Sequence, residues 1–426
     1  MSAHLKNVGR VPSRGGSTEG AKESGSRVVP LSEVVDFNPR FGKDELADDS
    51  LASFIPMRCV EEESGRFEPL GDRKVADVRK GYTPFRDGDV IFAKVTPCME
   101  NGKTAVLKGL TNGVGFGSTE FFALRPKNGL EAKYLFHFIL QSNFRRDAAG
   151  NMTGAVGLRR VPKSYLEQQT IPLPNPDQQR RIVAEIEKQF TRLEAGVAAL
   201  RRVQANLKRY RAAVLKAACE GRLVPFDLSA WKRLKVSEIG EAVTGNTPPT
   251  SDKENLGDEL PFFKPTDLDA GYNVREARQY LSAKGAKHAR VLPAGAVLVT
   301  CIGATIGKTG FARVDCATNQ QINALVANPK VATPEWAFWL FSSPVGQQQI
   351  KSNASATTLP ILNKSKFEAL AFPIPPLAEQ TRIVAEVERR LSVVEEMEAV
   401  VSANLQRATR LRQSILQKAF TGNFAY

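Results

Sequence analysis

The chain has 426 residues, of which 42% are hydrophobic and 24% are charged, so it predicts a globular protein of two or more domains. A formal net charge of +14 favours a polyanionic partner such as nucleic acid. No apolar run approaches the ~18 residues of a membrane-spanning helix, and five scattered cysteines with three histidines argue against a disulfide framework, a zinc site and general-base catalysis. We expect a cytoplasmic protein with no membrane partner.

The first half of the chain predicts a tail, a mixed domain and a long helix. Residues 1–26 are rich in Gly and Ser and predict a flexible tail. In the domain expected over 27–176, Asp87-Gly-Asp-Val-Ile-Phe-Ala-Lys-Val95 runs into Asn101-Gly-Lys-Thr104, which is typical of a strand, a turn and a returning strand. A short helical pattern follows over 132–144.

Residues 177–223 predict one long helix. Apolar side chains recur there at steps of three and four residues, the stripe expected of a helix seam. The predicted seam positions are Ile182, Ile186, Leu193, Leu200 and Leu207. Prolines at 174 and 176 break the preceding strand and open the helix. A helix of about 40 residues reaches about 60 Å, which suits a spacer better than a core element.

The second half repeats the first. Ile171-Pro-Leu-Pro174 matches Phe372-Pro-Ile-Pro375 at a shift of 201 residues, and about 16 of 53 aligned positions are identical. A second mixed domain is expected over 224–376, where Ala294 to Ile302 runs into Ile306-Gly-Lys-Thr309 and a helical pattern covers 334–350. A second long helix is expected over 377–426, with seam positions Ile383, Val387, Val394, Leu405 and Ile415.

These elements predict an α+β chain. Two mixed domains alternate with two long helices, and the helices bury their stripes most simply as an antiparallel coiled coil with pseudo-two-fold symmetry. From Gln178 to Arg222 the first helix carries 11 Lys and Arg against 4 Asp and Glu, so it could lie near a phosphate backbone. The second helix is better suited to protein contacts.

Catalytic motifs are missing from the sequence. There is no Asn/Asp-Pro-Pro-aromatic loop of an adenine methyltransferase and no Gly-rich cofactor loop. Gly303-Ala-Thr-Ile-Gly-Lys-Thr309 resembles a phosphate-binding loop but is one residue short, and the first half keeps only Asn101-Gly-Lys-Thr104. The repeated Gly-Lys-Thr therefore indicates a shared structural or DNA-facing element.

Basic and polar side chains near these turns are the candidate DNA contacts, because such groups meet phosphates and base edges. In the first half they are Lys94, Thr96, Asn101, Lys103, Thr104, Arg159, Arg160 and Lys163. In the second half they are Lys264, Thr266, Thr300, Thr305, Lys308, Thr309 and Lys364. Any one of them could instead be a solvated loop residue, and only the match between the halves favours a common site.

With the repeat laid out, the chain resembles the specificity subunit of a type I restriction-modification system. The marks are the two Pro-x-Pro segments followed by an Arg-Ile-Val-Ala-Glu helix start, at 172–185 and 373–386, and the strings Lys264-Pro-Thr-Asp-Leu268 and Ile306-Gly-Lys-Thr309. The first half of the chain departs from the last two of these motifs, the Lys-Pro-Thr-Asp-Leu and Ile-Gly-Lys-Thr strings. The resemblance implies two target-recognition domains, each reading half of a split double-stranded DNA site, with the helix pair setting the gap.

The resemblance also implies partners. Two methyltransferase subunits would bring S-adenosylmethionine and methylate an adenine in each half-site, and a translocating restriction subunit would join them. The chain itself would bind no cofactor or metal and carry no catalytic site. Three alternatives remain: a non-catalytic helical scaffold, a methyltransferase-nuclease fusion, and the specificity chain of a methylation-only defence system.

Overall fold

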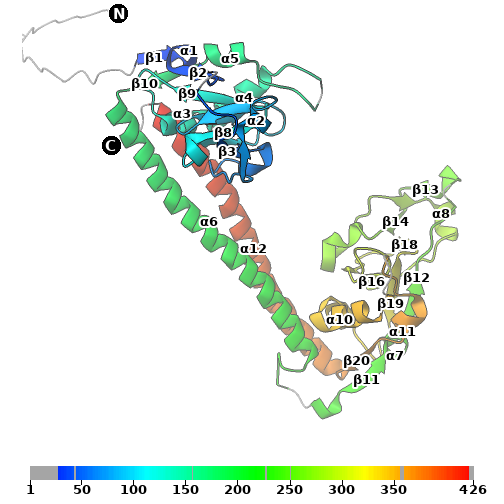
Figure 1. The fold of residues 1–426 in the computed structure, drawn as a ribbon. Helices are drawn as coiled ribbons and strands as arrows, with labels where there is room; N and C mark the ends of the chain where they lie inside the picture. Colours follow the sequence, from blue (N-terminus) through cyan, green and yellow to red (C-terminus); the bar gives the residue numbers. More distant parts are fainter. Residues whose placement is uncertain are drawn as a thin grey trace, which may run out of the picture. The chain divides into compact units, whose positions relative to one another are not determined.

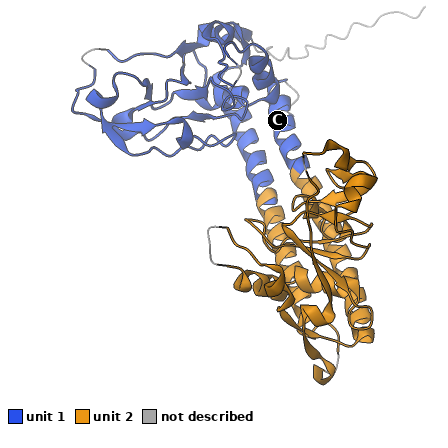
Figure 2. Cartoon of the chain, turned by 90° about the vertical axis from the view of Figure 1, so that its right-hand side faces the viewer, with its two compact units in different colours: residues 1–196, 406–426 blue, residues 197–405 orange. Residues whose placement is uncertain are grey.

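The computed structural model describes residues 27–42, 45–155, 157–225, 228–249, 251–355 and 359–421. The predicted tail, 1–26, lies outside these residues. By its contacts the chain divides into two compact units, residues 1–196 with 406–426 and residues 197–405 (Figure 2). The division passes through both long helices, so each unit contains part of each helix. Within the described ranges, no helix is long and apolar enough to cross a membrane.

The first unit contains two four-stranded sheets and a two-stranded ribbon. The sheets have the strand orders β2-β9-β6-β7 and β4-β3-β8-β5, and β1 pairs with β10. The strands are β1 (Arg27–Pro30), β2 (Val35–Phe37), β3 (Leu51–Ile55), β4 (Asp72–Lys74), β5 (Thr83–Arg86), β6 (Val90–Ala93), β7 (Thr104–Val106), β8 (Val114–Gly117), β9 (Phe121–Pro126) and β10 (Thr170–Leu173). The short helices are α1 (Leu31–Val34), α2 (Val75–Val78), α3 (Ala132–Ile139), α4 (Ser142–Gly150) and α5 (Lys163–Gln168).

The second unit repeats this plan. Its sheets are β12-β19-β16-β17 and β13-β15-β14-β18, and β11 pairs with β20. The strands are β11 (Lys232–Lys235), β12 (Gly240–Thr244), β13 (Leu256–Gly257), β14 (Leu260–Phe263), β15 (Tyr280–Leu281), β16 (Val297–Thr300), β17 (Thr309–Phe311), β18 (Ala317–Thr318), β19 (Ile322–Ala327) and β20 (Ala371–Ile374). The helices are α7 (Val236–Ile239), α8 (Ala283–Lys287), α9 (Pro334–Ser342), α10 (Pro344–Asn353) and α11 (Lys364–Glu368).

The pairing of the strands confirms the internal repeat. The predicted hairpins are β6 with β7 and β16 with β17, both antiparallel. Each unit also contains one parallel pair in its second sheet, β3 with β8 and β14 with β18. The helical patterns predicted over 132–144 and 334–350 are each divided into two helices. In the second unit the break falls at Ser343, because the following Pro344 disfavours helical geometry at the residue before it.

The two long helices are α6 (Pro176–Cys219) and α12 (Leu377–Phe420), each of 44 residues (Figure 1). At 1.5 Å per residue each is about 66 Å long. α6 begins with proline, and Asn175 and Gln178 exchange backbone and side-chain hydrogen bonds in a capping box. It ends at Cys219, and Gly221 just beyond it has a φ of 69°, which suits the left-handed position after a helix. The α+β class with two long helices is confirmed.

Each unit holds the two helices together with a hydrophobic seam. In the first unit Ile182 and Ile186 of α6 join the cluster that contains Ile415 of α12. In the second unit Leu207 packs with Val394 and Val401. The ten predicted seam positions are all buried or half-buried: Ile182, Ile186, Leu193, Leu200, Leu207, Ile383, Val387, Val394, Leu405 and Ile415.

A duplicated ion pair links the two long helices within each unit. Arg412 donates to Glu194 at 3.1 Å in the first unit, and Arg211 donates to Glu395 at 3.1 Å in the second. At the shift of 201 residues, Glu194 matches Glu395 and Arg211 matches Arg412. These four residues are identities of the repeat that the sequence analysis did not single out. Their pairing across the helices could have been inferred only with the register known.

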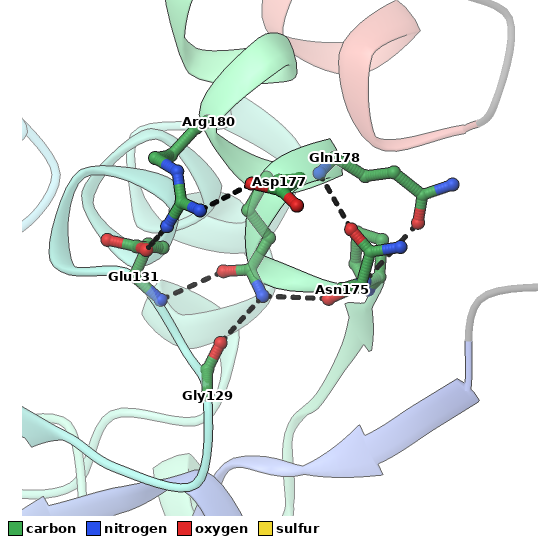
Figure 3. A network of polar contacts seen from close by, with 8 residues as sticks. Gly129, Glu131, Asn175, Asp177, Gln178 and Arg180 are labelled. Atoms are coloured by element: carbon green, nitrogen blue, oxygen red, sulfur yellow. Dashed lines mark hydrogen bonds and ion pairs between the residues drawn. The ribbon is translucent and has the colours of Figure 1, made fainter.

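A buried glutamine ties the start of each long helix to its own domain. In the first unit the Gln179 side chain accepts from the Glu131 backbone N–H at 2.8 Å and donates to the carbonyl oxygens of Gly129 and Pro174, both at 2.8 Å (Figure 3). In the second unit the side chain of Gln380 accepts from Thr333 N and donates to the Val331 and Pro375 carbonyls, again at 2.8 Å. In each unit one buried amide therefore joins the first turn of the long helix to the loop before α3 or α9 and to the end of the preceding strand.

His137 makes the first unit sensitive to acid. Its side chain is 3% exposed, its ring packs edge-on against Phe136 and Phe190, and neither ring nitrogen has a partner within the described part of the chain. Burial, with smaller contributions from Arg412 and Lys133, lowers its pKa to about 3. The unfolded chain binds a proton near pH 6.5, so this contribution to stability is complete above that pH and is lost as the pH falls towards 3.

We therefore expect the first unit to lose about 2 kcal/mol of unfolding free energy between pH 7 and pH 5. His137→Phe should remove most of this loss, because phenylalanine fills the same aromatic site without titrating. Thermal unfolding measured across this pH range checks the expectation, with His288→Gln as the control for an exposed histidine. Equal acid sensitivity in the wild type and in His137→Phe would assign the effect to other groups.

Candidate nucleic-acid interface

Backbone hydrogen bonds bring two separate segments together at the end of the central hairpin in each unit. In the first unit Val161 N donates to Lys94 O at 2.9 Å and Thr96 N to Arg159 O at 3.0 Å. We call residues 94–103 with 157–161 the first paired loops. In the second unit Leu362 N donates to Cys301 O at 2.8 Å and Gly303 N to Pro360 O at 3.0 Å. Residues 301–308 with 359–362 are the second paired loops.

A helix side chain supports the Gly-Lys turn of each hairpin. Gly102 and Gly307 both have positive φ, 71° and 88°, which the tight turn requires. Arg145 of α4 donates to Glu100 O at 2.6 Å and is ion-paired with Glu63, whereas Gln347 of α10 donates to Gly307 O at 2.6 Å. Arg145 and Gln347 were not predicted as site residues, because nothing in the spacing of a surface helix indicates which of its side chains reaches a distant turn.

The resemblance of residues 303–309 to a phosphate-binding loop is not supported by the fold. A phosphate-binding loop leads into the N-terminus of a helix, whose free N–H groups hold the phosphates. Here Gly307 leads into strand β17, which pairs with β16. The repeated Gly-Lys-Thr string is therefore a hairpin turn in both units.

The first paired loops bring most of the predicted cations of that unit to one place. Lys94 lies 5.5 Å from the centre of the Phe122 ring, and Arg159 is exposed with no ion pair to any described residue. Arg160 binds Glu120 through two nitrogens, at 2.7 and 2.9 Å, and this contact lowers the pKa of the Glu120 carboxyl. Lys94 and Arg159 are therefore more available to an incoming anion than Arg160.

The other polar candidates of the first unit make contacts within the protein. Thr96 donates to Glu100 at 2.9 Å, and Asn101 donates to Glu62 at 2.9 Å. Lys103 is half-buried, with its ammonium 3.4 Å from Met57 O. Lys163 starts α5 and pairs with Glu167 one turn later, at 3.1 Å. Of these four, Asn101 and Lys163 lie at the surface.

The second unit places its candidates less closely together. Lys308 lies in the paired loops and forms an ion pair with Asp269 at 2.6 Å. Lys264 follows β14 and lies 5.8 Å from the Phe262 ring centre. Lys364 starts α11 and pairs with Glu368 at 3.6 Å. Thr266 and Thr305 are exposed.

Three predicted contacts are corrected by burial. Thr104 and Thr300 are 0% exposed and Thr309 is 9% exposed. The Thr104 hydroxyl donates to Ile91 O across the hairpin, and the Thr309 hydroxyl donates to Gly307 O within the turn. These three threonine side chains are therefore buried within the hairpins and do not lie at the surface where DNA contacts were expected.

A cleft adjoins the first paired loops. It has a volume of about 540 Å³, and its lining includes Lys94, Asn38, Arg40, Tyr82 and Thr119. A smaller cleft of about 200 Å³ in the second unit is lined by Lys264, Thr247, Asn255 and Gln279 among others. Each cleft combines a cation with amide and hydroxyl groups, the side chains that read base edges. Asn38, Arg40, Tyr82, Thr247, Asn255 and Gln279 were not predicted from the sequence, because they come from segments far from the turns.

Comparison with known proteins identifies the family. The family model for the type I restriction modification DNA specificity domain matches residues 24–199 and again residues 229–393. The two matches together cover most of the chain. The chain belongs to this family.

Several specificity subunits are similar to the chain in sequence. The EcoEI specificity subunit of Escherichia coli is 39% identical over 165 residues, which are 38% of this chain and 27% of that protein. The EcoAI specificity subunit of E. coli is 38% identical over 36% of this chain and 26% of that protein. The chain thus spans about a quarter of each of these relatives. The EcoBI specificity subunit of E. coli is 26% identical over 63% of this chain and 61% of its own length.

Solved structures share the fold. A chain from a type I restriction-modification system, solved in a study of complex assembly and conformational transition, superposes with a TM-score of 0.79 at 23% identity, over 94% of this chain and 98% of that one. The HsdS subunit of Thermoanaerobacter tengcongensis gives a TM-score of 0.61 at 23% identity, over 96% and 100%. At these identities the likeness establishes the fold of the specificity-domain family.

Proposed function

We propose that this chain is the non-catalytic specificity subunit of a type I restriction-modification complex and reads a bipartite double-stranded DNA target. The observation that carries the proposal is the duplication of the paired loops. The same strand end and return segment meet in both units, and Lys94 and Arg159 in the first and Lys308 in the second put positive charge there. Two equivalent readers on one chain fit a target with two defined halves and a fixed gap.

The partners follow from the same proposal. Two methyltransferase subunits supply S-adenosylmethionine and the catalytic site, and a translocating restriction subunit completes the complex. The complex works in the cytoplasm, where it meets the DNA. Membership in the specificity-domain family supports these partners.

The test is to express the chain with its neighbouring methyltransferase in an unmethylated host and to map modified adenines across the genome. We expect a split motif of two short defined halves around a constant gap. The methyltransferase expressed without this chain serves as the control. A continuous motif would mean that only one unit reads DNA. Modification that does not depend on this chain would favour the alternative that the chain is a non-catalytic helical scaffold.

Within the candidate site, Arg159→Ala should weaken DNA binding and make it less dependent on salt. Loss of one phosphate contact lowers the slope of log affinity against log salt by about 1. Lys308→Ala should have a smaller effect, because Asp269 already neutralises that ammonium. Binding isotherms at several salt concentrations check this, with Lys133→Ala, a lysine paired with Glu187 on α6, as the control. An unchanged slope for Arg159→Ala would remove Arg159 from the phosphate contacts.

A further inference from the structure

The smaller cleft of the second unit has room for one ring system. Its volume is about 200 Å³, and we call it the slot. Its apolar walls include Pro248, Phe262 of β14 and Leu281 of β15, the last two only 2% and 1% exposed. A protein cavity of about 150 Å³ with apolar walls holds one benzene ring. The slot therefore suits a single flat ligand that is slightly larger than benzene.

The slot contains a buried acceptor that is not used within the protein. Asn255 lines the slot and is 2% exposed, and Ser282 N donates to its carbonyl oxygen at 3.1 Å. The side-chain Nδ2 donates to Pro249 O at 3.0 Å, which fixes the orientation of the amide. Its Oδ1 accepts no hydrogen bond from any described residue. Because a buried acceptor costs free energy until a donor meets it, the slot favours a ring that carries an N–H group.

Donor groups also border the slot. Lys264 is exposed, its ammonium lies 5.8 Å from the centre of the Phe262 ring, and it has no ion pair within the described ranges. The side chain of Gln279 lines the slot as well. An ammonium and an amide suit ring acceptors and a nearby phosphate. A nucleobase matches this set of groups, because it is flat, carries N–H donors and ring acceptors, and is attached to a phosphate backbone.

Hydrogen bonds connect the slot to the second paired loops. Thr247 lines the slot, and its hydroxyl donates to Gln320 Oε1 at 2.7 Å. The adjacent Gln321 accepts at its carbonyl oxygen from Cys301 N of the paired loops, at 2.8 Å. DNA held at the second paired loops would therefore lie close to the slot.

We propose that the slot binds one unstacked nucleobase of the half-site read by the second unit, with Asn255 Oδ1 accepting from an N–H group of the base. The inference rests on the proposed function, because it requires DNA at the second paired loops. A base inside the duplex presents only its edge in the groove, so a site that holds a whole ring requires the base to leave the stack. The apolar walls and the hydrogen bond to Asn255 then offset the lost stacking. This base is distinct from the adenine taken by the methyltransferase.

The test uses the full chain in complex with its methyltransferase subunits, on a duplex with the mapped target and on a scrambled duplex. Asn255→Leu removes the acceptor and should weaken target binding about tenfold, with no change on the scrambled duplex. Leu256→Trp should have the same effect by filling the slot, since Leu256 lines it and is 50% exposed. Leu228→Trp is the matched control, because Leu228 is 52% exposed and lies outside the slot. If Asn255→Leu melts at a lower temperature than the wild type, Leu256→Trp decides.

Target duplexes that each carry one abasic nucleotide locate the base. At one position of the half-site the wild type and Asn255→Leu should bind equally well, because neither can make the contact. At every other position the tenfold difference should remain. 2-Aminopurine placed beside the identified position should fluoresce more strongly in the wild-type complex than in the Leu256→Trp complex, because its neighbour has left the stack only in the wild type.

The possible outcomes separate the two proposals. A wild-type complex that does not prefer the target would overturn the proposed function itself. A wild type that prefers the target, with slot variants that bind it equally well or a deficit that persists at every abasic position, would overturn only the base slot. An abasic position that removes the deficit without any rise in fluorescence would mean that the base is read within the stack, which also overturns it. Loss of the methyltransferase from the purified Leu256→Trp complex would assign the slot to a protein partner instead.

Discussion

Inserting four helix-forming residues after Leu200 in α6 and four after Val401 in α12 should lengthen the gap in the recognised DNA motif by one or two base pairs. The two positions are equivalent in the repeat, and each helix is continuous there. Four residues add about 6 Å to a helix, and a base pair occupies about 3.4 Å. The paired insertion keeps the contacts of both units, because four residues make slightly more than one turn. Genome-wide mapping of methylated adenines gives the new gap directly.

The control is a matched insertion of two residues at the same positions. Two residues rotate the following helix by about 200°, which turns Leu207 and Val394 away from the seam. This variant should lose folding or target-dependent methylation altogether. An unchanged gap in the four-residue variant would show that the helices do not set the distance between the half-sites, and changed half-sites would show that the insertion disturbs the readers themselves.

Gln179→Ala and Gln380→Ala should each destabilise only their own unit, by about 3 to 5 kcal/mol. Each substitution removes three hydrogen bonds and leaves buried backbone groups without partners. Hydrogen–deuterium exchange locates the effect. Gln179→Ala should raise exchange over 129–133 and 171–183, whereas Gln380→Ala should raise it over 331–335 and 372–384.

Two further variants sharpen this experiment. Gln179→Glu keeps the acceptor for the Glu131 N–H but cannot donate to the carbonyls of Gly129 and Pro174, so it should be nearly as damaging as alanine. Gln178→Ala changes the exposed neighbour and removes only its 3.3 Å capping contact with Asn175 N, so it should cost much less stability than Gln179→Ala. Equal exchange in both units for either glutamine variant would mean that the glutamines act on the whole chain and not on one helix start.

Most of the architecture could be predicted because it depends on patterns that are local or repeated. The stripe in residues 177–223 and its copy after 377 require long helices whatever they pack against. The Gly-Lys turns predicted hairpins, because an apolar strand lies a short distance before and after each turn. The candidate site was harder to predict. The repeat marked both Lys94 and Arg159 as candidates. That they lie in the same paired loops depends on the backbone hydrogen bonds of Lys94 with Val161 and of Thr96 with Arg159, which the sequence does not show.

The sequence by itself determined that this protein is duplicated, that long amphipathic helices separate its mixed domains, and that basic residues recur near matching turns. The tertiary structure decided what each recurring residue does, because burial depends on neighbours far away in the chain. It made Thr104, Thr300 and Thr309 core residues and paired Lys308 with Asp269. It left Leu158 and Leu359 exposed. It also buried the equivalent Gln179 and Gln380, whose hydrogen bonds hold the starts of α6 and α12 to their own domains.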